Sequence, residues 1–95
     1  MNSNSRFQFQ LYIAGGAQNS VQAMANLSAL CKAHLPNRHK INVVDVYKEP
    51  KRALADRVFL TPTLVKLWPL PVLRIVGTLS QTQLVVQALD LPSAP

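Results

Sequence analysis

The sequence contains few cysteines, few acidic residues and no long apolar run, and each shortage excludes a class of protein. Cys31 is the single cysteine among 95 residues, so the chain can form neither an internal disulfide nor a Cys-x-x-Cys redox pair. The four acidic residues are too few and too scattered to suggest a pair of catalytic carboxylates. No apolar run approaches the about 20 residues that a membrane-spanning helix requires, so we expect no membrane partner.

What is present predicts one folded domain. Apolar residues make up 48% of the chain and charged residues 15%, which is typical of a globular domain rather than a disordered segment. We expect one domain over residues 1–95, with residues 1–5 and 92–95 frayed. The polar start of the chain has no apolar signal core, and together with the single cysteine it predicts a cytoplasmic protein.

Hydrophobic periodicity predicts a strand, a helix and a second strand in the first half of the chain. Apolar and polar side chains alternate over residues 7–13, which is the period of a strand with one buried face. A helix is expected from near Val21, capped by Asn19 or Ser20. Its apolar face comprises Met24, Leu27, Leu30, Cys31 and Leu35. β-Branched residues over 41–47 predict a central strand, so the three elements form a parallel βαβ unit.

The second half predicts a short basic helix over residues 50–58, strands over 64–67 and 72–76, and a final helix over 81–89. Ser80 is the expected cap of that last helix, and its buried face would comprise Leu84, Val85, Ala88 and Leu89. The β-branched residues of this segment are also compatible with a strand, which would give a different topology. Its glutamines, Ala88 and Leu89 favour the helix, because small propensity differences add up along the segment.

Pro62 is the most informative single residue. A proline cannot donate to a strand ladder, so its place between Thr61 and Thr63 marks the first residue of a strand. We expect a cis peptide before Pro62, since cis bonds are essentially confined to prolines in turns. A Thr-Pro strand opening after a βαβ unit is the pattern of the thioredoxin-like folds. We therefore predict an α/β domain of order β-α-β-α-β-β-α that lacks redox chemistry and serves in binding.

Side chains that could carry catalysis, metal or cofactor chemistry are isolated along the chain. His34 and His39 have no cysteine or carboxylate at metal-ligand spacing, so we expect surface residues and no metal. Cys31 lies on the apolar helix face, where a buried structural thiol is expected rather than a nucleophile. The pair Gly15-Gly16 precedes a helix, but the nucleotide-binding glycine motifs are absent. These features predict that the protein is not an enzyme and has no cofactor.

Basic residues are concentrated in the second half of the chain. The net charge of +6 favours an acidic partner surface or nucleic acid. The clustered cations are Lys48, Lys51, Arg52, Arg57, Lys66 and Arg74. Nucleic-acid surfaces interleave such residues with exposed aromatic rings, whereas Phe7 and Phe9 are expected in the core. A protein partner is therefore favoured over nucleic acid.

Several segments together resemble the KaiB family of small clock proteins. They are Leu11-Tyr12-Ile13-Ala14-Gly15, Asn19-Ser20-Val21, Val44-Asp45-Val46-Tyr47-Lys48-Glu49-Pro50, Thr61-Pro62-Thr63-Leu64-Val65-Lys66, the run from Pro69 to Gly77, and Leu89-Asp90-Leu91. The resemblance extends from about Phe9 to Leu91, and the combination is specific although no single segment is. The sensor domain of the histidine kinase SasA is similar to a lesser degree.

The resemblance implies a non-enzymatic regulator that binds the ATPase KaiC, with a KaiA-like or SasA-like protein as a further partner. It also implies two folds: a KaiB-specific fold that assembles as a dimer or tetramer, and a thioredoxin-like monomer that binds KaiC. Carried over by motif, the implied partner-binding residues are Lys48, Arg57, Lys66, Arg74 and Asp90. Ala88 stands where many clock members have glycine, which implies a shift toward the thioredoxin-like state.

We expect no acidic C-terminal tail of the kind common in cyanobacterial members of the family, since no acid follows Asp90. Together with the +6 charge, this leaves two roles open: a circadian oscillator, or a clock-related signalling or stress system with a KaiC-like ATPase. The alternative to both is a thioredoxin-like adaptor or sensor module that binds another protein, such as a histidine kinase.

Overall fold

The structure, a computed structural model, describes residues 6–94 and has the predicted order of elements. These are β1 (Phe7–Ile13), α1 (Gln18–His34), β2 (His39–Asp45), α2 (Pro50–Ala55), β3 (Thr63–Trp68), β4 (Leu73–Val76) and α3 (Thr82–Ala88). Residues 1–5 and Pro95, for which fraying is expected, lie outside the described range. Within the expected frayed tail, the Pro92 carbonyl oxygen lies 2.8 Å from Nδ1 of His34 on α1.

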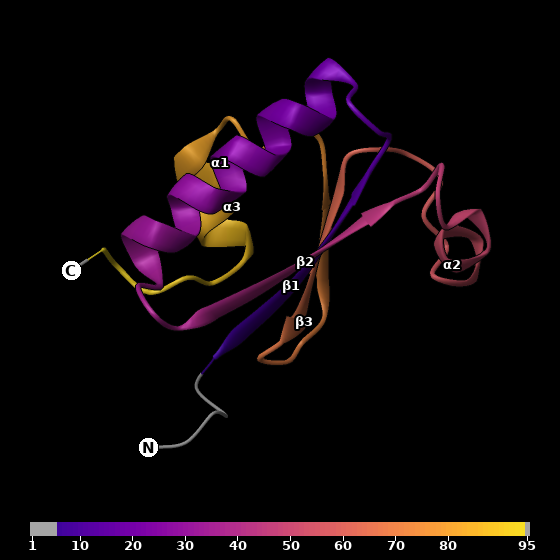
Figure 1. Cartoon of the computed structure of the whole chain (residues 1–95). Coiled ribbons are helices and arrows are strands. Elements are labelled where there is room, and N and C mark those ends of the chain that lie inside the picture. Colours follow the sequence, from indigo (N-terminus) through magenta and orange to yellow (C-terminus); the bar gives the residue numbers. More distant parts are fainter. Residues whose placement is uncertain (1–5, 95) are drawn as a thin grey trace.

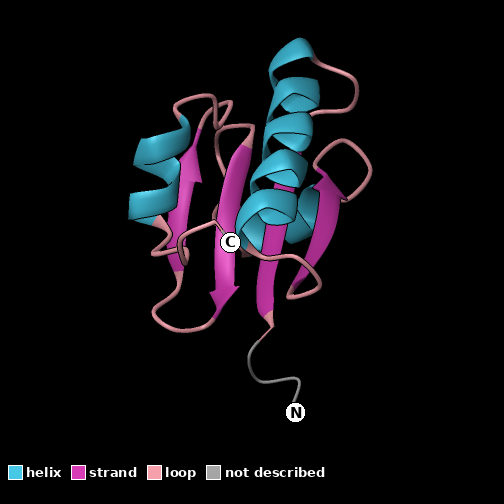
Figure 2. Ribbon diagram, turned by 90° about the vertical axis from the view of Figure 1, so that its left-hand side faces the viewer, coloured by secondary structure: helices cyan, strands magenta, loops and turns pink. Residues whose placement is uncertain are grey.

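The strands form one sheet in the order β2-β1-β3-β4, with α1 and α3 on one face and α2 on the other (Figures 1 and 2). β1 pairs in parallel with β2, as the βαβ prediction requires, and antiparallel with β3. The expectation that residues 41–47 form a central strand is wrong, because β2 lies at an edge of the sheet. No strand of residues 6–94 pairs with its outer side, and most of its residues are exposed or half-buried.

β1 is the central strand in packing terms, because helices cover both of its faces. Phe9 and Leu11 point into the larger core, which they share with α1 and α3. Tyr12 points into the smaller core, where α2 packs on the opposite face of the sheet. The alternation of apolar and polar residues predicted one exposed face for this strand, but Gln10 and Tyr12 are buried as well.

The helices differ from the prediction at their first residues and on their buried faces. α1 begins after Ala17, and Ser20 instead accepts a hydrogen bond from the backbone N–H of Ala14 at 3.0 Å. α3 begins after Gln81 rather than Ser80. Met24, Leu84 and Ala88, all expected to be buried, are exposed, whereas the remaining predicted core positions of both helices are buried. Across residues 6–94, no helix is long and apolar enough to cross a bilayer.

The segment that could have been helix or strand is the helix α3, so the structure has the thioredoxin-like order and not the strand alternative. The predicted cis peptide before Pro62 is confirmed, and the peptides before Pro69 and Pro71 are cis as well.

Both short helices end in the same hydrogen-bonded turn, with a charged residue in the left-handed conformation. After α3, the N–H of Leu91 donates to Val86 at 3.0 Å and the N–H of Asp90 donates to Gln87 at 3.1 Å. This pattern is a Schellman motif, in which Asp90 occupies the position that glycine usually takes, at φ 56°.

The end of α2 repeats this arrangement. The N–H of Val58 donates to Ala53 at 2.9 Å and that of Arg57 donates to Leu54 at 3.0 Å, with Arg57 at φ 59°. Ala53 and Val58 are both buried in the smaller core. The apolar contact that accompanies a Schellman motif therefore anchors the end of α2 to the sheet.

Glycine substitutions at the end of α3 should act in opposite directions. Ala88→Gly should destabilise the thioredoxin-like state by up to about 1 kcal/mol, because glycine has more backbone entropy to lose in a helix. Asp90→Gly should stabilise this state by about 1 kcal/mol, because glycine adopts the left-handed conformation without steric cost. Urea unfolding measured by circular dichroism tests both changes, and NMR would report any shift toward a second fold. Changes of the same sign would contradict the α3 geometry.

Candidate partner-binding surface

Three of the predicted partner-binding cations surround α2. Lys48 lies in the turn before the helix, Arg57 follows its last turn, and Arg74 lies on β4. All three side chains are exposed. Arg74 is the cross-strand partner of Val65, which is buried beneath α2, so Arg74 points to the α2 face of the sheet. The structure thus brings these cations to one face.

Lys66 does not belong to this surface, in contrast to the expectation from the sequence. Side chains alternate along β3, and Lys66 shares the face of Leu64, which points into the larger core on the side of α1. Only 2% of Lys66 is exposed, and its Nζ lies 6.0 Å from the centroid of the Phe7 ring. Lys66 is buried because β3 is an interior strand with both faces covered.

Asp90 is also separated from the α2 surface. It follows α3, which packs on the opposite face of the sheet from α2 (Figure 1). Ala88 lies at the end of the same helix. These two residues therefore belong to the α3 side of the molecule, and the structure gives Asp90 the backbone role described above.

Arg74 fastens the end of α2 to the sheet. Its Nη1 donates to the carbonyl oxygen of Arg57 at 3.0 Å, and its Nη2 donates to the carbonyl oxygen of Asp56. These carbonyls are at the C-terminus of the helix, where a cation is favoured by the helix dipole. The arginine thus stabilises the helix on which the other cations depend for their position.

A chain of hydrogen bonds holds the inner side of α2 against β1. Arg52 donates from Nη2 to Oε1 of Gln10 at 2.9 Å. Gln10 donates from Nε2 to the hydroxyl of Tyr12 at 2.6 Å, and this hydroxyl donates to the Asp56 carboxylate. Burial, with a smaller contribution from Asp56, raises the pKa of Tyr12 above its usual value of 10.0.

This network has no signature in the sequence, because Gln10 and Tyr12 occupy the polar positions of an alternating strand. Only the packing of α2 over that face turns these two residues into buried groups that need hydrogen-bond partners. Asp56 is a lone acid in a basic segment, and nothing in its sequence neighbourhood pairs it with Tyr12, which lies 44 residues away.

Exposed apolar side chains lie near the cations, although nothing in the sequence distinguishes them from core residues. Phe59 is 76% exposed, and the other large apolar residues in this region with more than half of their surface exposed are Tyr47, Leu54, Leu60 and Val76. Phe59, Leu60 and Val76 line a shallow hollow of about 150 Å³ together with Arg57 and Arg74. Aromatic residues and arginine are the side chains that most often dominate protein interfaces.

Tyr47 is held in place by the turn after β1. The Asp45 carboxylate accepts hydrogen bonds from the N–H of Tyr47 at 2.9 Å and from the N–H of Gly15 at 3.2 Å. Gly15 has φ 53°, and a Cβ atom at this residue would lie 3.3 Å from Cδ2 of Tyr47. Glycine is therefore favoured here by the backbone conformation, and a larger residue would also require the tyrosine ring to shift slightly.

The groups that could have carried other chemistry are in structural positions. Burial raises the pKa of the Cys31 thiol to about 11, which disfavours the nucleophilic thiolate. Nδ1 of His39 lies 2.8 Å from the carbonyl oxygen of Leu35, and His34 contacts the C-terminal segment as described. Within residues 6–94, no group of histidine, cysteine and acidic side chains is placed to hold a metal ion.

Comparison with known families decides the relationship of this chain. A sequence model of the KaiB domain matches residues 10–91, which is most of the protein. The chain belongs to the KaiB family. Similar family members include the circadian clock protein KaiB3 of a Synechocystis species, with 37% identity over 92% of this chain and 85% of that protein. The circadian clock oscillator protein KaiB of Synechococcus elongatus is 38% identical over 96% of this chain and 89% of that protein.

Solved structures confirm the thioredoxin-like fold of this KaiB family member. The N-terminal domain of SasA from Synechococcus elongatus superimposes with a TM-score of 0.70 at 21% identity, covering 90% of this chain and 85% of that domain. Thioredoxin-2 of a malaria parasite gives a TM-score of 0.73 at 20% identity, covering 90% of this chain and 82% of that protein. At these identities the likeness concerns the fold alone.

Removing the Tyr12 hydroxyl tests whether the buried network holds α2. Tyr12→Phe should lower the free energy of unfolding by about 1–3 kcal/mol, because it leaves Gln10 and Asp56 without their shared partner. Because the pKa of Tyr12 is higher in the folded state, the neutral hydroxyl contributes to stability below pH 10. This contribution is lost as the pH rises through the folded-state pKa. The free energies of unfolding of wild type and Tyr12→Phe, measured in urea between pH 7 and pH 11, should therefore converge at high pH. A constant difference between wild type and variant would contradict this role.

Proposed function

We propose that this protein is a non-enzymatic, protein-binding regulator of a KaiC-type ATPase in a circadian clock or a clock-related signalling or stress system. The observation that carries the proposal is the KaiB domain match over residues 10–91, with relatives named as circadian clock proteins. The proposal is supported by a surface around α2 that combines cations with exposed apolar side chains. Such a surface suits docking onto another protein better than it suits a reaction.

The chemistry of this surface suggests an acidic face on the ATPase. The chain has ten basic and four acidic residues, so its long-range field attracts negative surfaces. Lys48 and Arg57 are exposed at the two ends of α2, and Leu54 on the helix is 64% exposed. The apolar residues would supply binding energy, and the cations would supply orientation and association rate.

Further partners follow from the same proposal. A KaiA-like or SasA-like protein would bind together with, or in competition with, this chain on the ATPase. In the KaiB-specific fold, a second copy would be the partner, as a dimer or tetramer. A cytoplasmic location belongs to the same proposal, since the ATPase would have to be reached there.

A second candidate is a thioredoxin-like adaptor or sensor module for another protein, such as a histidine kinase. It is supported by the similarity to the SasA N-terminal domain, with a TM-score of 0.70. The two candidates differ in the protein that they bind, so a pull-down with purified KaiC-type ATPase separates them. Retention on the ATPase favours the first candidate, and retention on a kinase alone favours the second.

Charge reversals around α2 test the proposed contact with the ATPase. Lys48→Glu and Arg57→Glu should each weaken binding by about threefold to tenfold, because each replaces an attraction with a repulsion. The loss should shrink at high salt, where screening shortens the range of the charges to about 3 Å at 1 M. Isothermal titration calorimetry at two salt concentrations measures both effects.

Lys32→Glu is the matched control, because it makes the same change in net charge on α1, across the sheet from α2. The Lys32 side chain is exposed, so this variant should fold and bind normally apart from a general charge effect. Reversal of Lys66 is unsuitable here, since this buried residue would report on folding. If Lys32→Glu weakened binding as strongly as the other two variants, the contact would not lie around α2.

A further inference from the structure

The outer edge of β4 has backbone groups directed away from the sheet. The N–H of Gly77 donates to the Pro62 carbonyl at 3.0 Å, which continues the ladder between β4 and β3. Hydrogen-bonded and non-bonded pairs alternate along an antiparallel ladder, so Ile75 bonds to β3 whereas Arg74 and Val76 direct their N–H and C=O groups outward. β4 is an edge strand, and its outward groups can pair with an additional strand.

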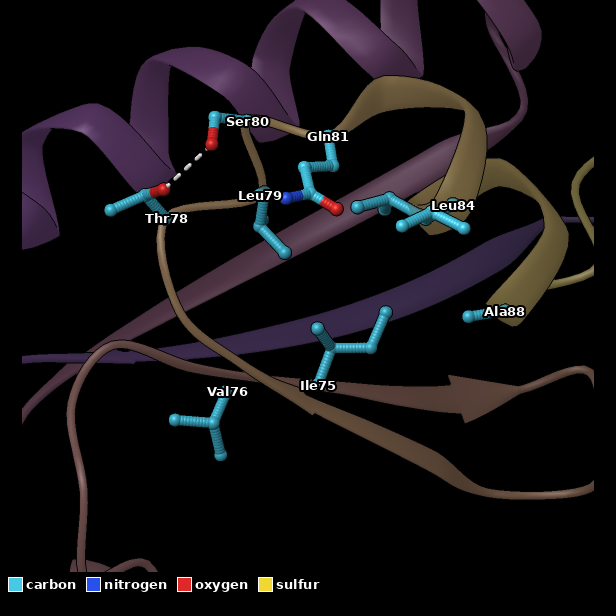
Figure 3. A pocket seen from close by; sticks show the side chains of 9 residues that line it. Ile75, Val76, Thr78, Leu79, Ser80, Gln81, Leu84 and Ala88 are labelled. Atoms are coloured by element: carbon cyan, nitrogen blue, oxygen red, sulfur yellow. Dashed lines mark hydrogen bonds between the residues drawn. The ribbon is translucent and has the colours of Figure 1, made fainter.

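An apolar groove of about 390 Å³ lies beside this edge, on the α3 face of the sheet. Ile75 points into it from β4, Leu79 from the following loop, and Leu84 and Ala88 from α3 (Figure 3). Leu84 is 60% exposed, although it is a large apolar side chain on a short helix. Apolar groups form the larger part of the lining, and Thr78, Ser80 and Gln81 contribute polar groups, with the Gln81 side chain lying between Leu79 and Leu84.

The hollow rimmed by Arg57 and Arg74 lies on the other face of the same strand. Val76 lines both depressions, so they meet at the edge of β4. Arg74 uses two of its donors on the carbonyls that end α2, and a guanidinium has five. Positive charge therefore remains available on this side, while the opposite side is apolar.

We propose that β4 pairs with an extended segment of an acidic protein in which apolar and acidic residues alternate. Successive side chains of an added strand point to opposite faces. The apolar residues of that segment enter the α3 groove, and the acidic residues meet Arg57 and Arg74. A second copy of this chain fits less well, because each copy carries a charge of +6 and would present arginines to arginines.

A blocked synthetic peptide in which glutamate and leucine alternate is the probe. Binding to the ¹⁵N-labelled full chain should shift the amide signals of Arg74, Val76 and Gly77. Val76→Pro removes one outward N–H without touching the β3 ladder and should weaken binding by about twofold to tenfold. Leu84→Glu should weaken it by about tenfold or more, because it removes apolar contact from the groove and repels the acidic peptide.

Val43→Glu is the matched control, since Val43 is an apolar residue on β2 at the opposite edge of the sheet, 46% against 60% exposed, and the charge change is identical. This variant should bind the peptide normally. A control peptide of the same composition, in which all leucines precede all glutamates, should bind weakly. In that peptide each block would direct the same kind of side chain to both faces of the added strand. If Val76→Pro does not fold, a peptide methylated at alternate backbone nitrogens replaces this variant. The methylated peptide lacks the N–H groups that would donate to the outer edge of β4.

Equal effects of Leu84→Glu and Val43→Glu would overturn the proposal, as would amide shifts confined to α2. Self-association of the free chain that Val76→Pro abolishes would assign the edge to a second copy instead. Pairing of this segment with β4 does not require the ATPase. Leu84→Glu should weaken peptide binding and leave ATPase binding unchanged, whereas Lys48→Glu should weaken ATPase binding alone, so failure of one proposal leaves the other intact.

Discussion

The structure depends on one strand that is covered on both faces. β1 places Phe9 and Leu11 in the core beneath α1 and α3, and it places Tyr12 beneath α2. A buried hydroxyl requires a hydrogen-bond partner, and the Asp56 carboxylate at the end of α2 supplies it. Isolated helices of this length are unstable in water. The helix α2 therefore depends on its contacts with β1 for both its stability and its orientation.

The surface around α2 inherits its geometry from this attachment. Arg74 donates to the last carbonyls of the helix, and the buried pair Ala53 and Val58 closes its final turn. Arg57 is consequently held at a positive φ angle in a position that glycine would occupy at lower cost. The proposed contact with an acidic face of the ATPase would account for an arginine at this position, because its side chain would bind the partner.

The two sides of the molecule have different chemistry. The α2 side carries exposed cations and aromatic rings, whereas the α3 side offers an apolar groove beside the free edge of β4. The strand β4 separates them, because its side chains alternate between the two faces. One partner could therefore bind the α2 side while a second partner, or another part of the same partner, binds the α3 side.

The order of elements, the parallel βαβ unit, the strand opening at Pro62 and the family could all be predicted from the sequence. They depend on local periodicity and on a specific set of short segments. Tertiary structure alone decided which polar residues are buried. Lys66 occupies a strand position that sequence cannot distinguish from an exposed one, and only the covering of β3 on both faces places it in the core. Tyr12 and Asp56 form their hydrogen bond although 44 residues separate them in the sequence. Arg57 and Asp90 occupy the left-handed position after a helix, where glycine is the usual residue, so the local sequence does not indicate these helix ends. Burial and pairing depend on what lies across the sheet, and that information is not contained in the spacing of neighbouring residues.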